Sequence, residues 1–126
     1  MEFGVGIFMI VMATGIVAIW TRDIVTAASL DISRGRWKAR DPRSQSLLLP
    51  HWVAEYGTAL ALLIGGVGLV LDWRSGRSIS FAALGALLYT STNSLGWVLA
   101  DRSRIVYGVP MVIGACGALI CIVILI

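Results

Sequence analysis

The chain carries little charge for its length. Only 13% of its 126 residues are Asp, Glu, Lys or Arg, whereas a soluble domain carries about 25%. Hydrophobic residues make up 58% of the chain, against about 45–50% in soluble domains. So little polar surface cannot cover a water-soluble globule, and the apolar residues are gathered in blocks. The composition therefore excludes an ordinary soluble domain and predicts an integral membrane protein.

Residues that bind metals or react with substrates are also scarce. The chain has one histidine and two cysteines, Cys116 and Cys121, which a helix turns about 140° apart around its axis. One histidine and one nearby acid are too few ligands for a zinc site. The sequence also lacks a CxxC pair, a phosphate-binding glycine loop and a nucleophile–base arrangement. It therefore predicts no metal, no cofactor and no catalytic residue, and it favours a protein that is not an enzyme.

Four long apolar windows are present, at about 3–20, 52–71, 79–100 and 105–126. A transmembrane helix needs about 20 predominantly apolar residues, so each window is long enough to span a bilayer. No basic residue precedes the first window, which therefore differs from a cleaved signal peptide. We expect one all-α membrane domain over residues 1–126, a four-helix bundle with up-down connections. Aromatic residues that suit the membrane interface lie near the predicted ends: Trp20, Trp52, Trp73, Trp97 and Tyr107.

The basic residues predict an orientation. Eight of the ten lie in the first connection, residues 21–50, or in the third, residues 101–104, and only Arg74 and Arg77 lie in the second. By the positive-inside rule the first and third connections are cytoplasmic and both termini are extracytoplasmic, as expected in a plasma (inner) membrane. A basic patch in the long loop is expected to rest on anionic headgroups rather than to bind nucleic acid. Its residues are Arg34, Arg36, Lys38, Arg40 and Arg43.

Three further features concern the ends of the predicted helices. The segment from Arg22 to Ile32 keeps a helical pattern, so the first helix is expected to continue beyond the membrane surface. Pro50 suits the first turn of the second helix. Pro110 either begins the last helix or bends it, and the sequence leaves both open.

Small residues line one face of each of the last three predicted helices, which predicts close helix–helix contacts and a homo-oligomer or larger membrane complex. On the second helix the face comprises His51, Glu55, Thr58, Ala59, Leu62, Gly65, Gly66 and Leu69. On the third it comprises Ala82, Gly85, Ala86, Tyr89, Asn93, Gly96 and Ala100. On the fourth it comprises Pro110, Gly114, Gly117, Ala118 and Cys121.

Polar side chains inside the predicted spans indicate a candidate binding site. His51 and Glu55 share a helix face, and at 1.5 Å per residue Glu55 lies about 6 Å beyond His51 and Asn93 about 10 Å from the cytoplasmic end of its helix. Ionisable groups at such depths usually face a cavity or a partner. We therefore predict a ligand-binding cluster of Glu55, His51, Asn93, Tyr89 and Thr14 in the cytoplasmic half.

A purely structural interpretation of the same residues is also open. His51 then lies at the headgroups as an ordinary interfacial residue. Glu55 is then an interfacial acid or pairs with Arg22 or Arg102 to hold the loops. The run YTSTNS, residues 89–94, then makes hydrogen bonds between helices.

The four-span layout resembles the membrane-associated proteins of eicosanoid and glutathione metabolism. The resemblance rests on Glu55-Tyr56 and on the polar third span, and it implies a polar site in the cytoplasmic half. That family expects an arginine and an asparagine before this glutamate, where the chain has His51-Trp52-Val53-Ala54, and an arginine in the third span, which has none. Because the glutathione motif is missing, we transfer no site and do not assign the family.

Two functions are open. The first is a non-enzymatic accessory or assembly subunit that acts through its Gly/Ala-rich helix faces and its basic cytoplasmic loop. The second is a bundle that binds a small molecule, a lipid or a proton around Glu55, as a transporter, a sensor or an enzyme for a lipophilic substrate. We expect the first, because the chain offers mainly helix surfaces and no catalytic group.

Overall fold

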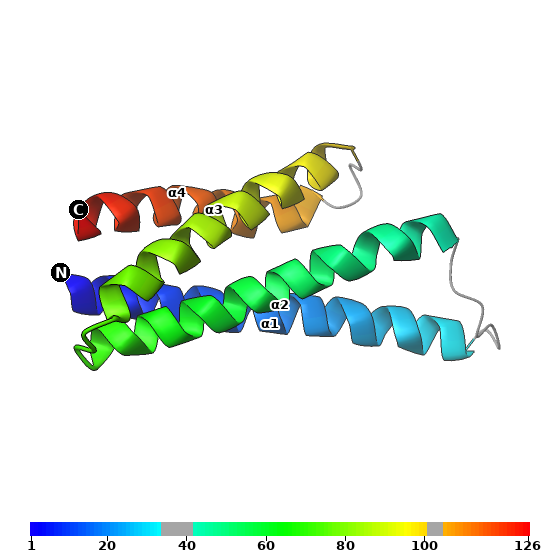
Figure 1. Cartoon of the computed structure of the whole chain (residues 1–126). Coiled ribbons are helices and arrows are strands. Elements are labelled where there is room, and N and C mark those ends of the chain that lie inside the picture. The colour runs from blue at the N-terminus through cyan, green and yellow to red at the C-terminus, as the bar shows by residue number, and fades with distance from the viewer. Residues whose placement is uncertain (34–41, 101–104) are drawn as a thin grey trace.

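The computed structural model describes residues 1–33, 42–100 and 105–126, which form four helices (Figure 1). They are α1 (Glu2–Ser33), α2 (Pro42–Val70), α3 (Gly76–Ala100) and α4 (Ile105–Leu125). The prediction of an all-α chain with four helices is confirmed.

Three segments are long and apolar enough to cross a membrane, namely Glu2–Arg22 of α1, Pro50–Val70 of α2 and Gly108–Leu125 of α4. They indicate a membrane protein. Within the described residues α3 does not reach the same mean hydropathy. Its polar run at 89–94 separates two shorter apolar stretches. Three of the four predicted spans are thus confirmed by length and composition, and the fourth stays a prediction.

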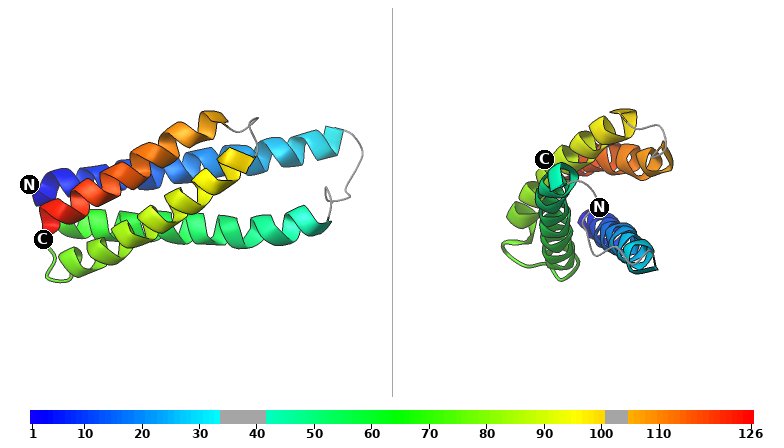
Figure 2. Two further views of the ribbon diagram at one scale, coloured as in Figure 1. Left: turned by 90° about the horizontal axis from the view of Figure 1, so that it is seen from above. Right: turned by 90° about the vertical axis from the view of Figure 1, so that its right-hand side faces the viewer.

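Each helix packs against the next one along the chain, whereas α1 and α4 touch over a shorter stretch. Both termini and the short connection between α2 and α3, residues 71–75, lie at one end of the bundle (Figure 1). We call this the terminal end. In the left of two further views α4 crosses α1 at an angle (Figure 2). Gly117 and Gly114 of α4 lie close to Phe8 and Met12 of α1.

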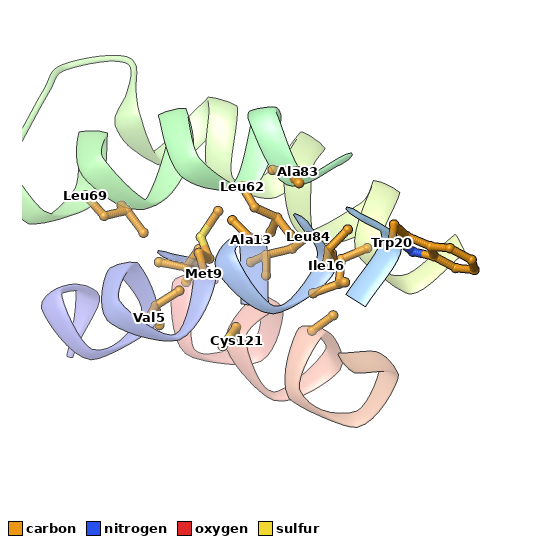
Figure 3. Packing of buried hydrophobic residues seen from close by; sticks show 14 residues of the cluster. Val5, Met9, Ala13, Ile16, Trp20, Leu62, Leu69, Ala83, Leu84 and Cys121 are labelled. Atoms are coloured by element: carbon orange, nitrogen blue, oxygen red, sulfur yellow. The ribbon is translucent and has the colours of Figure 1, made fainter. Parts of the chain in front are cut away.

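Buried apolar side chains from all four helices form one core (Figure 3). Met9, Leu62, Leu84, Leu87 and Leu125 are almost fully buried. Many other large apolar residues, including Phe3, Leu60 and Val123, remain exposed on the outer faces. This distribution suits a bundle whose outer solvent is hydrocarbon.

Glycines bring the helices of the core close together. A Cβ added to Gly66 of α2 would lie 2.8 Å from the carbonyl oxygen of Gly6 in α1, and the reverse substitution would meet Gly66 at the same distance. In α4, Gly117 lies against the ring of Phe8, and a Cβ on Gly114 would lie 2.7 Å from Ser91 Oγ. The small-residue faces of α2 and α4 are therefore used inside the chain itself.

The small-residue face of α3 points outward instead. Ala82, Gly85, Tyr89, Asn93 and Gly96 are all exposed, and Ala86 is half-buried. The opposite face of α3 is the packed one. It carries Ser80, Leu84, Leu87, Ser91, Ser94 and Val98, all buried.

The structure corrects one predicted helix boundary. α2 begins at Pro42, and Pro50 lies inside the helix rather than in its first turn. Proline suits the first position of a helix because its missing N–H would be unbonded there anyway, and Pro42 occupies that place. α1 extends to Ser33, so the predicted continuation of the first helix is confirmed, and Pro110 lies within α4. Of the predicted basic patch, Arg34, Arg36, Lys38 and Arg40 lie outside the described residues, as does the side chain of Arg43.

Arg77 joins three helices at the terminal end. Its guanidinium donates from Nε to the carbonyl oxygen of Leu125 at 2.9 Å, and from a second nitrogen to the same oxygen. Its Nε also lies 3.8 Å from the carboxylate of Glu2. A cation at the last carbonyls of α4 compensates the negative end of that helix dipole.

Replacing Arg77 by methionine is expected to lower the free energy of unfolding by about 1–2 kcal/mol, because hydrogen bonds from charged donors are strong but this side chain is half exposed. Chemical unfolding in detergent micelles, followed by circular dichroism, measures the change. Arg74→Met is the control, since Arg74 is exposed and has no ion pair with a described residue. Equal losses in the two variants would contradict the contribution of Arg77.

Candidate functional site

Glu55 is a carboxylate buried in the bundle. It lies on the face of α2 that also carries Thr58, Ala59 and Leu62, and this face packs against other helices. Only 1% of its surface is exposed. Placing a carboxyl group there costs free energy unless its oxygens are hydrogen-bonded, so its neighbours decide what the site can do.

The neighbours of Glu55 come from its own helix and from α3. Ser94 Oγ donates a hydrogen bond of 2.9 Å to Glu55 Oε1. His51 Nε2 lies 3.8 Å from the same Oε1 and 3.5 Å from Ser94 Oγ. Because a hydroxyl both donates and accepts, Ser94 can accept from His51 while it donates to Glu55. The three side chains therefore form a short polar chain between α2 and α3.

All of these contacts converge on one carboxylate oxygen. Within residues 1–33, 42–100 and 105–126, Glu55 Oε2 makes no hydrogen bond. It is also not one of the fully buried side-chain atoms that lack a hydrogen-bond partner, so part of its surface is accessible. In the same part of the chain Glu55 has no ion pair with a lysine or an arginine. One acceptor oxygen is thus open to a further group.

An aromatic side chain of α1 contacts His51. The ring of Trp20 in α1 meets the ring of His51 edge-on, with centroids 4.9 Å apart and an interplanar angle of 82°. The indole N–H groups of Trp20 and Trp52 are buried and make no hydrogen bond to described residues. Trp20 thereby links α1 to the polar chain of α2 and α3.

A cavity of about 240 Å³ lies beside Glu55, between α1 and α4. Its α4 lining residues, 109–111 and 113, precede Gly114 and Gly117, so the cavity lies farther from the terminal end than the contact of Gly117 with Phe8. Among the described residues its walls are apolar except for Glu55 and Ser91. The lining residues are Val11, Met12, Gly15, Ile16 and Ile19 of α1, Glu55 of α2, Leu87 and Ser91 of α3, and Val109, Pro110, Met111 and Ile113 of α4.

The structure brings together only two of the five residues of the predicted cluster, His51 and Glu55. Tyr89 is 71% exposed and Asn93 is also exposed, both on the outer face of α3. Thr14 is exposed and bonds back to the carbonyl of Ile10 at 2.9 Å. It lines a separate hollow between α1 and α2, of about 480 Å³, that also includes Tyr56. A ligand-binding role for any of the five stays a prediction.

Sequence reasoning missed Ser91 and Ser94, which occupy the inner face of α3 near Glu55. A signal was available in the spacing of Ser80, Leu84, Leu87, Ser91, Ser94 and Val98, which alternates four and three residues as one helix face does. The pairing of Glu55 with Arg22 is not observed, since Arg22 is exposed, and Arg102 lies outside the described residues.

No family model, curated protein or solved structure matches this chain. Within the described residues no three metal-ligating side chains lie together. The chemical capacity of the site therefore follows from its geometry: Glu55 lines the cavity, one of its carboxyl oxygens is bonded by Ser94 and lies near His51, and the other has no hydrogen bond to a described residue.

Proposed function

We propose that this protein is a four-span membrane protein that binds a small lipophilic molecule at Glu55. In this proposal α3 crosses the bilayer with the other three helices, which places both termini on the extracytoplasmic side of a plasma (inner) membrane. The bias of basic residues towards the first and third connections supports the orientation. The terminal end is then extracytoplasmic, and Glu55 lies in the cytoplasmic half.

One observation carries the proposal: Glu55, a glutamate that is 1% exposed, forms part of the wall of a cavity whose other described lining residues are apolar apart from Ser91. Ionisable side chains inside membrane segments are costly and mark binding sites, relays or partner contacts. A purely structural Glu55 would direct both oxygens at protein donors, yet Oε2 has none among the described residues. Ligand sites have this composition, with apolar walls and a few placed polar groups.

The test is Glu55→Gln, which keeps the size of the side chain and an oxygen that can accept from Ser94. We expect wild-type protein, purified in mild detergent, to carry a bound small molecule in native mass spectrometry. We expect Glu55→Gln to bind that molecule about ten- to one-hundredfold more weakly, because a charge-assisted hydrogen bond contributes about 1.5–3 kcal/mol.

Glu2→Gln is the matched control, since Glu2 is an exposed glutamate at the terminal end, away from the cavity. It is expected to retain the molecule as wild type does. Equal occupancy in wild type and Glu55→Gln would remove Glu55 from the proposed site. Thermal unfolding of both variants separates lost binding from lost structure.

A second function, assembly, is supported by the outer face of α3. Small residues at Ala82, Gly85 and Gly96 allow another helix to approach closely, and Tyr89 and Asn93 would gain hydrogen-bond partners there that lipid does not offer. An accessory or assembly subunit, in a homo-oligomer or a larger complex, would use this face and the basic loop, which suits anionic headgroups. The same native mass spectra test it, since a mass of one chain throughout would oppose a homo-oligomer.

A further inference from the structure

The geometry points to the chemical class of the ligand: a lipophilic cation, an amine with a hydrocarbon body, that reaches Glu55 sideways from the bilayer between α1 and α4. This inference rests on the proposed function and specifies the molecule for the same site. Three features of the cavity carry it.

The first feature is the wall. Met12 and Ile16 of α1, Leu87 of α3 and Met111 of α4 present apolar side chains to the cavity. Such a wall favours a hydrocarbon body, at about 25 cal/mol for each Å² of apolar surface removed from water. A polar molecule such as a sugar or a nucleotide would lose its water here and find almost no hydrogen-bonding groups. The body of the ligand is therefore apolar.

The second feature is the polar side of the cavity, where Glu55 and Ser91 line it. An ionised carboxylate only accepts hydrogen bonds, and the open Oε2 of Glu55 has no lysine or arginine near it in the described part of the chain. A protonated amine supplies a donor for Oε2 and a positive charge in addition to His51, which lies on the Oε1 side, and attraction between opposite charges is stronger away from water. An anionic head group would be repelled. A neutral alcohol can donate a hydrogen bond but brings no charge.

The third feature is the entrance. Val11 of α1, together with Val109 and Ile113 of α4, line the cavity and are also exposed on the side of the bundle. These residues lie within the apolar segments Glu2–Arg22 and Gly108–Leu125. Towards the terminal end the cavity is closed where Phe8 packs on Gly117. We therefore infer a lateral route from the bilayer, into which lipophilic amines partition.

The test compares three probes with the same twelve-carbon chain: N,N-dimethyldodecylamine, 1-dodecanol and dodecanoate. Each is titrated into full-length protein in nanodiscs of zwitterionic lipid, with empty nanodiscs correcting for partition into lipid. We expect the amine to bind wild type about ten- to one-hundredfold more tightly than the alcohol, and dodecanoate to bind more weakly than either. Glu55→Gln should bring amine and alcohol to similar affinities, and Glu55→Asp, which keeps a carboxyl group, should preserve the preference for the amine.

The outcomes separate the two proposals. If wild type binds the alcohol as tightly as the amine, the cation inference is overturned and the lipophilic site stands. If none of the probes binds above the empty-nanodisc level and purified protein carries no molecule, the proposed function itself is overturned. The comparison of probes on wild type needs no variant, so a poorly folded Glu55→Gln does not remove the test.

Discussion

Gly66→Ala is expected to lower the free energy of unfolding by about 1–3 kcal/mol, the usual cost of overpacking a close contact. The new Cβ would lie 2.8 Å from the carbonyl oxygen of Gly6, 3.0 Å from Ile10 Cγ1 and 3.1 Å from Met9 Cβ. A backbone oxygen cannot rotate away as a side chain does. The substitution therefore forces α1 and α2 apart along their contact, and chemical unfolding in detergent measures the loss.

Gly57→Ala is the control for Gly66→Ala, since Gly57 lies on the same helix and a Cβ there meets nothing within 4 Å. Alanine is favoured over glycine inside a helix by about 0.8–1 kcal/mol, so this variant should be as stable as wild type or slightly more stable. Both substitutions replace glycine by alanine, yet we expect the first to lower the free energy of unfolding and the second to leave it unchanged or raise it slightly. A stabilised Gly66→Ala would mean that α1 and α2 do not approach as closely as described.

Hydropathy predicted the helices well but their ends less well. The apolar windows near 3–20, 52–71 and 105–126 depend only on side-chain transfer energies, and each coincides with a segment able to span a membrane. α2 begins eight residues before Pro50, at Pro42. A helix continues wherever its residues can propagate it, so an apolar window marks the membrane layer rather than the length of the helix.

The half of the site on α2 was predictable and the half on α3 was not. His51 and Glu55 are four residues apart, and a helix alone places them on one face. On α3 five successive residues, 90–94, are polar, so polarity cannot choose the inward face. In the structure Ser94 faces Glu55 of α2 and Ser91 lies against Gly114 of α4, whereas Tyr89 and Asn93 are exposed. That choice depends on the neighbouring helix, which no single segment encodes.

The glycines also show what a single sequence segment cannot predict. Gly66 and Gly15 both lie inside apolar helical segments, and their sequence surroundings do not separate a tight contact from open space. In the structure a Cβ on Gly66 meets the backbone of α1, whereas a Cβ on Gly15 meets nothing within 4 Å, because Gly15 borders the cavity beside Glu55. The difference depends on the neighbouring helices and yields a direct test of the cavity.

Gly15→Leu is expected to abolish binding of the amine and the alcohol alike, on the order of tenfold or more, because overfilling a site strains the side chains around it. The protein should remain folded, since the new Cβ has space and leucine favours a helix over glycine by about 0.8–1 kcal/mol. This result differs from Glu55→Gln, which is expected to weaken the amine selectively. Titration of both probes into nanodiscs, with thermal unfolding alongside, measures the two effects separately.

Gly4→Leu makes the same change on the same helix, at an exposed position where a Cβ also meets nothing within 4 Å and which does not line the cavity. It should bind both probes as wild type does, so any general effect of a longer side chain on α1 appears in both variants and cancels. If Gly15→Leu keeps full binding of the amine, the ligand does not occupy the space between α1 and α4. The proposed place of the ligand beside Gly15 would then be wrong.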